Sequence, residues 1–197
     1  MKVPFRLQAS EYDCVPTTIL NALSYLYDRE DIPPLAIQRV FMYCLDSVSL
    51  RKNHGHGTTA YAVQLFGNWL NEFQEKKFRT SATYICGADV HLSNNNKIAR
   101  TINAKGVALL KVKTSGASWH YILALSIDEF WLHAFDPYPP QRRVSKIDKY
   151  AFISGARGQS PNLMIHRSWI DTLSNKESFR FGIQSEREAL LLERTEA

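Results

Sequence analysis

The order of the predicted elements indicates an α+β protein, in which helices come first and an antiparallel β-sheet follows. Amphipathic helical spacing fills most of the first half of the chain, whereas short runs of β-branched and apolar residues begin at Val107. The two patterns do not alternate as βαβ units would. With 197 residues, 45% of them hydrophobic and 22% charged, the chain has the length and composition of a globular domain. We therefore expect N-terminal helices packed on a C-terminal antiparallel sheet.

Four helices are expected before the sheet, because each apolar pattern is bounded by a start or stop signal. The first runs over residues 14–27, and the Asp31-Ile32-Pro33-Pro34 segment separates it from a second helix over 35–45. Thr58 or Thr59 is expected to cap a third helix. A fourth begins in the Ser-Asn cluster at 93–96 and ends at Gly106.

Six short segments carry strand patterns. They are residues 83–86, 107–112, 119–125, 130–135, 162–169 and 178–183. We expect residues 1–183 to form a single domain and residues 184–197 to be a charged C-terminal tail, either frayed or a short helix.

Charge and cysteine content restrict the class of partner. The 24 basic and 19 acidic residues give a net charge of +5, which does not demand nucleic acid. No apolar run approaches the ~18 residues of a membrane span, so we expect neither a nucleic acid nor a membrane as partner. Three widely spaced cysteines are no disulfide framework, and the N-terminus lacks the apolar core of a signal peptide. The chain is therefore expected to be cytoplasmic.

Cys14 is the first candidate for chemistry, because it stands where the first long helix should begin. The positive end of the helix dipole and the free backbone N–H groups there favour a thiolate. Cys44 and Cys86 lie among apolar residues, and neither opens a helix. The alternative for Cys14 is a small, buried, structural residue.

His120 and Asp136 are expected to meet across a β-hairpin. If residues 127–129 form a three-residue loop, Ser126 pairs with Phe130, and His120 then stands opposite Asp136 on the same face. A four-residue loop would make the pair diagonal. A carboxylate beside an imidazole fixes its tautomer and stabilises its charged form. The alternative is a cross-strand pair with a purely structural role.

Gln8 completes the set, since a side-chain amide six residues before Cys14 can donate to an oxyanion. The string from Gln8 to Cys14, with a helix after the cysteine, resembles the papain-like cysteine peptidases. It is closest to the bacterial peptidases that process bacteriocin leaders at a double glycine, and to their stand-alone relatives. In that family a Gln stands six residues before the nucleophile, an Asp often precedes it directly, and a His and then an Asp follow late in the chain. Here Asp13-Cys14, Trp119-His120-Tyr121 and Phe135-Asp136-Pro137 match.

The resemblance covers residues ~5–140 and has clear departures. The family has Gly after the nucleophile, whereas this chain has Val15-Pro16, which would narrow the approach to the thiol. The transporter members carry membrane and nucleotide-binding domains, and this chain has no GxxxxGK[ST] phosphate loop. The double-glycine substrate is therefore not carried over, and residues 141–197 match no pattern.

Together these residues predict a thiol hydrolase that acts on a peptide or protein substrate. Cys14 is the nucleophile, His120 the general base, Asp136 its orienting carboxylate and Gln8 an oxyanion donor. Two alternatives stay open: an acyltransferase with the same acyl-enzyme, and a catalytically idle peptide-binding module. No cofactor or metal is expected, since His54 and His56 with Cys44 fit no zinc spacing.

Overall fold

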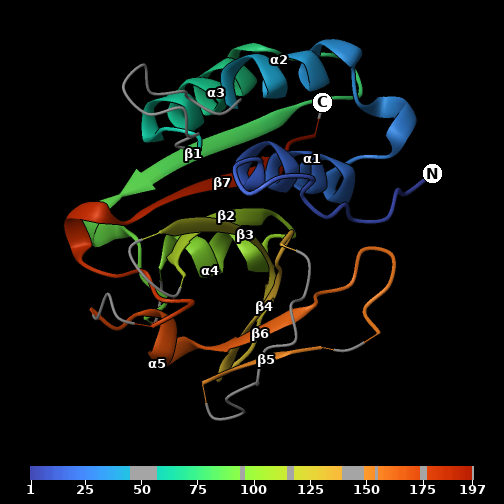
Figure 1. The fold of residues 1–197 in the computed structure, drawn as a ribbon. Coiled ribbons are helices and arrows are strands. Elements are labelled where there is room, and N and C mark those ends of the chain that lie inside the picture. Colours follow the sequence, from blue (N-terminus) through green and yellow to red (C-terminus); the bar gives the residue numbers. More distant parts are fainter. Residues whose placement is uncertain are drawn as a thin grey trace.

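The computed structural model describes residues 1–44, 57–93, 96–114, 118–138, 149–153, 155–173 and 177–196, and within them it shows a mixed α+β fold (Figure 1). Five α-helices are present in these ranges: α1 Cys14–Leu26, α2 Pro34–Cys44, α3 Ala60–Glu72, α4 Lys97–Asn103 and α5 Arg167–Ile170. The same ranges contain three 3₁₀ helices: η1 Arg29–Asp31, η2 Gly87–Asp89 and η3 Gln184–Glu186.

The described residues also form one seven-stranded sheet. Its strands are β1 Thr80–Cys86, β2 Val107–Lys113, β3 Trp119–Ile127, β4 Trp131–Phe135, β5 Tyr150–Phe152, β6 Leu163–His166 and β7 Glu188–Arg194. The order is β1-β7-β2-β3-β4-β6-β5, and every neighbouring pair is antiparallel. The sheet is twisted, and Figure 1 shows β4 running steeply across the direction of β1 and β7.

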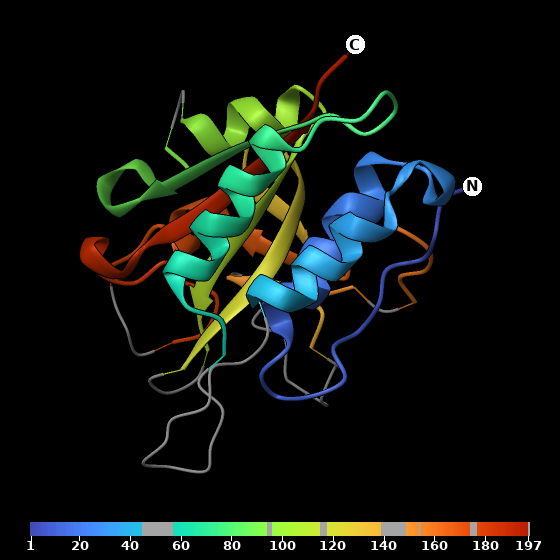
Figure 2. The same cartoon turned by 90° about the horizontal axis from the view of Figure 1, so that it is seen from above.

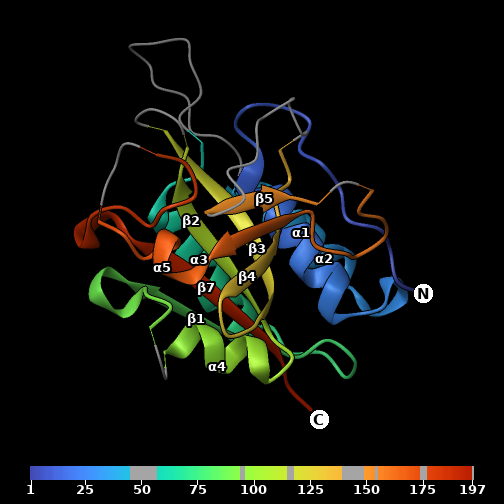
Figure 3. The same cartoon turned by 90° about the horizontal axis from the view of Figure 1, so that it is seen from below.

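Helices cover both faces of the sheet, so the expected single layer of helices on a sheet is too simple. The core on one face is made by α1, α2 and α3, which Figure 2 shows together over the strands. The core on the other face receives Ile98 and Ile102 from α4 and Trp169 and Ile170 from α5. Figure 3 shows α4 and α5 on this second side. The fold is thus a three-layer arrangement with the sheet in the middle.

The expected helix boundaries are confirmed to within a few residues. The Thr59 side chain accepts a hydrogen bond from the Ala62 N–H at the start of α3, and Asn96 does the same with Ala99 at the start of α4. These caps satisfy N–H groups that have no partner inside the helix.

The C-terminal segment was expected to be a charged tail, and this is wrong. Residues 188–194 form β7, which lies between β1 and β2 in the sheet. The apolar side chains Ala189, Leu190, Leu191 and Leu192 are buried and pack alternately on the two faces. A strand buried on both faces has a continuous apolar run rather than an alternating pattern, and the charged residues on both sides of this run disguise it.

Two other strand predictions differ from the structure. Residues 178–183 form no strand, and the 162–169 segment divides into β6 and the start of α5. Strand β5 was not expected at all. All three differences lie beyond the Asp136-Pro137 dipeptide, where the strands are short and their pairing depends on distant segments.

The β3–β4 hairpin has a register that differs from the expected one. Ser126 pairs with His133 rather than with Phe130. Further along, Ala124 pairs with Ala134, so Leu125 is an extra residue in β3 and creates a β-bulge.

This bulge decides which face Asp136 occupies. Without it, the register at the hairpin tip would place Asp136 opposite Leu123, whose side chain faces away from that of His120. With the bulge, the register places Asp136 opposite Ile122, two residues from His120 on the same face. The two residues are therefore diagonal neighbours instead of the direct partners that the sequence predicted.

None of the helices described in the structure is both long and apolar enough to cross a membrane.

Candidate functional site

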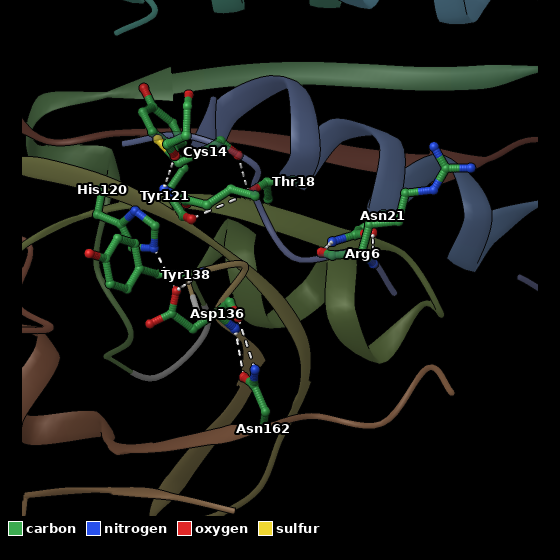
Figure 4. Close-up of polar contacts among 11 residues, drawn as sticks. Arg6, Cys14, Thr18, Asn21, His120, Tyr121, Asp136, Tyr138 and Asn162 are labelled. Carbon is green, nitrogen blue, oxygen red and sulfur yellow. Dashed lines mark hydrogen bonds and ion pairs between the residues drawn. The ribbon is translucent and has the colours of Figure 1, made fainter. Parts of the chain in front are cut away.

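The candidate site lies at one end of the sheet, where three elements begin or end. Helix α1 begins at Cys14, β3 begins at Trp119, and β4 ends at Phe135. The start of β3 and the end of β4 meet at the same end because the two strands are antiparallel. Figure 4 shows Cys14 on one side of the His120 ring and Asp136 on the other. Three of the four predicted site residues are thus brought together.

His120 and Asp136 form a buried pair. The distance between His120 Nε2 and Asp136 Oδ1 is 2.6 Å, and the two residues are 6% and 5% exposed. Asp136 Oδ1 also accepts a hydrogen bond of 2.9 Å from the Tyr138 N–H, and the Tyr138 ring meets the imidazole edge-on. Because Nε2 is engaged by the carboxylate, Nδ1 is the ring nitrogen that remains for Cys14.

This pairing shifts the protonation of the imidazole. Burial by itself lowers the pKa of His120, but the hydrogen bond to Asp136 and the interaction with the Cys14 side chain raise it to about 10. His120 is therefore an imidazolium at neutral pH. Its stabilising effect on the fold is complete below pH 6.5, its ordinary value, and is lost as the pH rises through about 10.

Asn162 fixes the position of Asp136, a role that was not predicted from the sequence. Its Oδ1 accepts from the Asp136 N–H at 2.7 Å, and its Nδ2 donates to the Asp136 carbonyl at 2.9 Å. These two hydrogen bonds hold the backbone of Asp136 just past the end of β4, where no neighbouring strand would otherwise hold it. The only local signal was an amide residue directly before β6.

Cys14 is fixed to the same strand that carries His120. Thr18 Oγ1 lies 2.6 Å from the Cys14 carbonyl and 3.3 Å from the Tyr121 carbonyl, which ties the first turn of α1 to β3. Cys14 is 8% exposed, so its sulfur faces a mostly dry environment. Val15 is 1% exposed and belongs to the core, and this burial places it inside the molecule rather than over the thiol.

Helix α1 begins without a side-chain cap. The carboxylate of Asp13, which precedes the helix, turns back and accepts from the Ala9 and Ser10 N–H groups. Partial burial raises the pKa of Asp13, but these hydrogen bonds outweigh it and hold the pKa below its ordinary value. In the described part of the chain, the Cys14 N–H has no hydrogen-bond partner and remains available to an oxyanion.

Gln8 lies at the other end of this loop. Its backbone N–H donates to the Pro137 carbonyl at 2.8 Å, directly after Asp136. Its side-chain amide is buried and donates to the Ser10 carbonyl at 2.7 Å. The Oε1 atom has no hydrogen-bond partner among the described residues. Gln8 thus borders the site, and no hydrogen bond joins it to Cys14.

A second buried charge lies near Cys14 and was not anticipated from the sequence. Glu188 of β7 accepts hydrogen bonds from the hydroxyl groups of Tyr121 and Tyr84, and Lys111 Nζ lies 3.3 Å from its carboxylate. Burial and the nearby Glu188 raise the pKa of Tyr121 far above its ordinary value, and the Cys14 side chain adds to this. The Tyr121 hydroxyl therefore stays protonated and serves as a fixed donor.

A second His–Asp pair lies at the hairpin tip and differs in its environment. His133 Nε2 is 2.9 Å from Asp128 Oδ2, and the carboxylate is half exposed. The hydrogen bond from His133 and those from the Trp131 and Phe130 N–H groups lower the pKa of Asp128 to about 2. This pair holds the turn and has no thiol beside it.

Within the described residues no group of three or more metal-ligating side chains comes together. His54 and His56, which the sequence analysis considered as ligands, lie outside the described ranges.

Known proteins provide no match from which a function could be assigned to this chain. No protein-family model matches the chain, and no curated protein matches it. The class that the fold and site define is a three-layer α+β protein with a buried Cys-His-Asp arrangement at one end of its sheet.

Substitution of Asp136 by Asn should shift the titration of His120. In the unmodified protein the imidazole should not titrate between pH 5 and pH 8, because its pKa is about 10. In Asp136→Asn the amide still accepts a hydrogen bond but carries no charge, so the pKa should fall toward the ordinary value. Ring C–H chemical shifts measured by NMR across this range report the difference. A His120 signal that titrates near pH 6.5 in the unmodified protein would contradict the buried ion pair.

Proposed function

We propose that this protein is a thiol hydrolase of the papain-like kind, which cleaves a peptide or amide bond through Cys14, His120 and Asp136. The observation that carries the proposal is the buried pair of His120 with Asp136, set against a cysteine at a helix N-terminus. A purely structural His–Asp pair has no need of a thiol beside the second ring nitrogen. Nucleophilic catalysis needs this order of groups: nucleophile, base and orienting carboxylate.

The reaction follows from the protonation of the pair. Because the His120 imidazole already carries the proton at neutral pH, the Cys14 sulfur attacks the carbonyl carbon of the scissile bond as the thiolate of the pair. The imidazolium then donates this proton to the leaving nitrogen as the C–N bond breaks, which leaves a thioester on Cys14. The neutral imidazole next takes a proton from water, whose oxygen attacks the thioester and releases the acid. Asp136 keeps the ring in one tautomer and stabilises it each time it becomes charged.

Negative charge that develops on the substrate oxygen is stabilised by donors at the start of α1. The Cys14 N–H is free for this role, since the Asp13 carboxylate accepts its backbone hydrogen bonds from Ala9 and Ser10 and caps no N–H of the helix. The Gln8 amide is the second donor. It retains one N–H beyond the bond to Ser10, and a small rotation of the side chain upon substrate binding aims this N–H at the oxyanion.

The papain-like resemblance supports the proposal at the level of arrangement. A helix that opens with the cysteine packs on an antiparallel sheet whose neighbouring strands supply the histidine and the aspartate. The burial of Val15 in the core supports this reading, because its side chain is not exposed to the solvent from which a substrate would approach.

The three cysteines should react at very different rates with a thiol-reactive probe. At pH 7 we expect Cys14 to react first with iodoacetamide, because the His120 imidazolium and the helix N-terminus stabilise its thiolate. Cys86 is exposed and provides the reference rate, whereas burial raises the pKa of the Cys44 thiol to about 12 and should protect it. Peptide mapping by mass spectrometry measures each rate. Labelling of Cys14 no faster than that of Cys86 would instead favour an idle binding module.

Turnover should depend on Asp136 and not on Asp128. A positional-scanning library of internally quenched peptides supplies the substrate. The Cys14→Ala variant measures the background rate, because it lacks the proposed nucleophile. Asp136→Asn should lower kcat about 10- to 100-fold in a protein that still folds, because the isostere keeps the hydrogen bond but not the charge. Its melting temperature at pH 7 should be lower, because the buried His120 loses the carboxylate that stabilises its charged form. Asp128→Asn is the matched control, since it changes the exposed His–Asp pair in the same way. A larger loss of kcat in Asp128→Asn than in Asp136→Asn would contradict the assignment of Asp136 to the catalytic triad.

Removal of the Gln8 amide should lower kcat by about 10²-fold, as expected for one oxyanion donor. Gln159→Ala is a suitable control, because Gln159 also ties down the N-terminal segment, through the carbonyls of Val3 and Ser24. The kcat of Gln8→Ala is compared with that of Gln159→Ala on the best library peptide. Equal kcat values in the two variants would leave the oxyanion to backbone donors alone.

A further inference from the structure

A cavity of about 550 Å³ lies beside the candidate site, between the N-terminal segment and the chain after β5. This volume is in the range of ligand-binding pockets. Most of its wall is apolar and comes from Pro4, Phe5, Leu7, Phe135, Phe152 and Ile153.

The wall of this cavity is continuous with the site but does not include it. Leu7 directly precedes Gln8, and Phe135 directly precedes Asp136. Asn162 lines the cavity and at the same time holds the backbone of Asp136. Cys14, His120 and Asp136 do not line it. The cavity is therefore a neighbouring pocket on the far side of the Asp136–Asn162 contact from the reacting sulfur.

The wall is built from ordered contacts. The Phe5 N–H donates to the Gly158 carbonyl at 2.8 Å, which joins the N-terminal segment to the loop after β5. The Phe5 ring packs on Phe135 with 4.7 Å between the ring centroids. A pocket whose two sides are joined in this way is preformed, so a ligand spends little binding free energy on ordering it.

One cation belongs to this otherwise apolar wall. Arg157 lines the cavity and is exposed, and its guanidinium forms no ion pair in the part of the chain that the structure describes. By contrast, Lys111, Lys113 and Arg180 each have a carboxylate partner. An exposed guanidinium in the wall of a mostly apolar cavity suits a ligand with a large apolar group next to a carboxylate.

We propose that this cavity is an exosite for the peptide substrate, which takes a bulky apolar side chain while Arg157 binds an acidic side chain next to it. The identity of the ligand as a substrate rests on the proposed function above. The exosite anchors the chain beside the triad and touches none of the reacting atoms. Its occupation therefore contributes equally to the ground state and the transition state, and it acts on KM rather than on kcat.

The first experiment measures binding without turnover. Four fluorescein-labelled hexapeptides in a Gly-Ser frame carry the central pairs Phe-Asp, Phe-Lys, Ala-Asp and Ala-Lys, and their polarisation is followed against the Cys14→Ala protein. Phe-Asp should bind about tenfold or more tightly than Ala-Asp, because it buries an aromatic ring. It should also bind several-fold more tightly than Phe-Lys, because of Arg157.

Two variants in the cavity provide the second experiment. Ala156→Phe fills the cavity, in whose wall Ala156 lies, and should abolish the advantage of Phe over Ala. Arg157→Glu should reverse the preference from Asp to Lys. Ala104→Phe and Arg100→Glu, on the exposed side of α4, are the matched controls and should leave the order of the four peptides unchanged. Melting temperatures confirm that all four variants fold.

The outcomes separate this inference from the proposed function. If the peptides bind in the expected order and the unmodified protein hydrolyses none of them, the cavity is supported as a peptide-binding site and the proposed hydrolase activity is contradicted. If peptides are hydrolysed but the two cavity variants leave both the order of binding and KM unchanged, the exosite is contradicted and the proposed hydrolase activity is supported. A fall of kcat with unchanged KM in the cavity variants would also overturn the exosite.

Discussion

The buried pair of His120 with Asp136 is the interaction on which the rest of the site depends. A carboxylate and an imidazole that are both about 95% buried lose most of their hydration, and only their mutual contact and added hydrogen bonds offset this cost. Loss of either partner would leave a charge buried without compensation. The structure therefore has to hold both residues in place. The β-bulge at Leu125 and the hydrogen bonds of Asn162 to the Asp136 backbone do so.

Side-chain amides hold the segments that no regular element holds. Asn162 brackets the backbone of Asp136, and Asn21 of α1 brackets Arg6 in the same way, with bonds of 2.8 and 2.9 Å. Each replaces the pair of hydrogen bonds that a neighbouring strand would supply. The extended N-terminal segment is thereby fixed along α1, which places Gln8 at the border of the site and Phe5 and Leu7 in the wall of the cavity.

A second buried carboxylate lies near Cys14, in the strand β7. Glu188 is held by two tyrosine hydroxyls and by Lys111, so its charge is compensated inside the sheet. Its strand, β7, is an interior strand of the sheet, between β1 and β2, although it comes last in the chain. The sheet, and with it the position of β3 and His120, is thus completed only when the C-terminus pairs with both β1 and β2, a long-range contact that local patterns do not reveal.

The sequence by itself determined the early helices, the strands from 107 to 135 and the identity of the residues that meet at the site. Periodicity, caps and the position of Cys14 at a helix start are local properties, and they are encoded within a few residues. The tertiary structure alone decided the place of β7, the clamp by Asn162 and the register of the hairpin. Each depends on contacts between distant segments, and the bulge at Leu125 shows why this matters: one extra residue moves Asp136 to the face of His120, and no local pattern specified it.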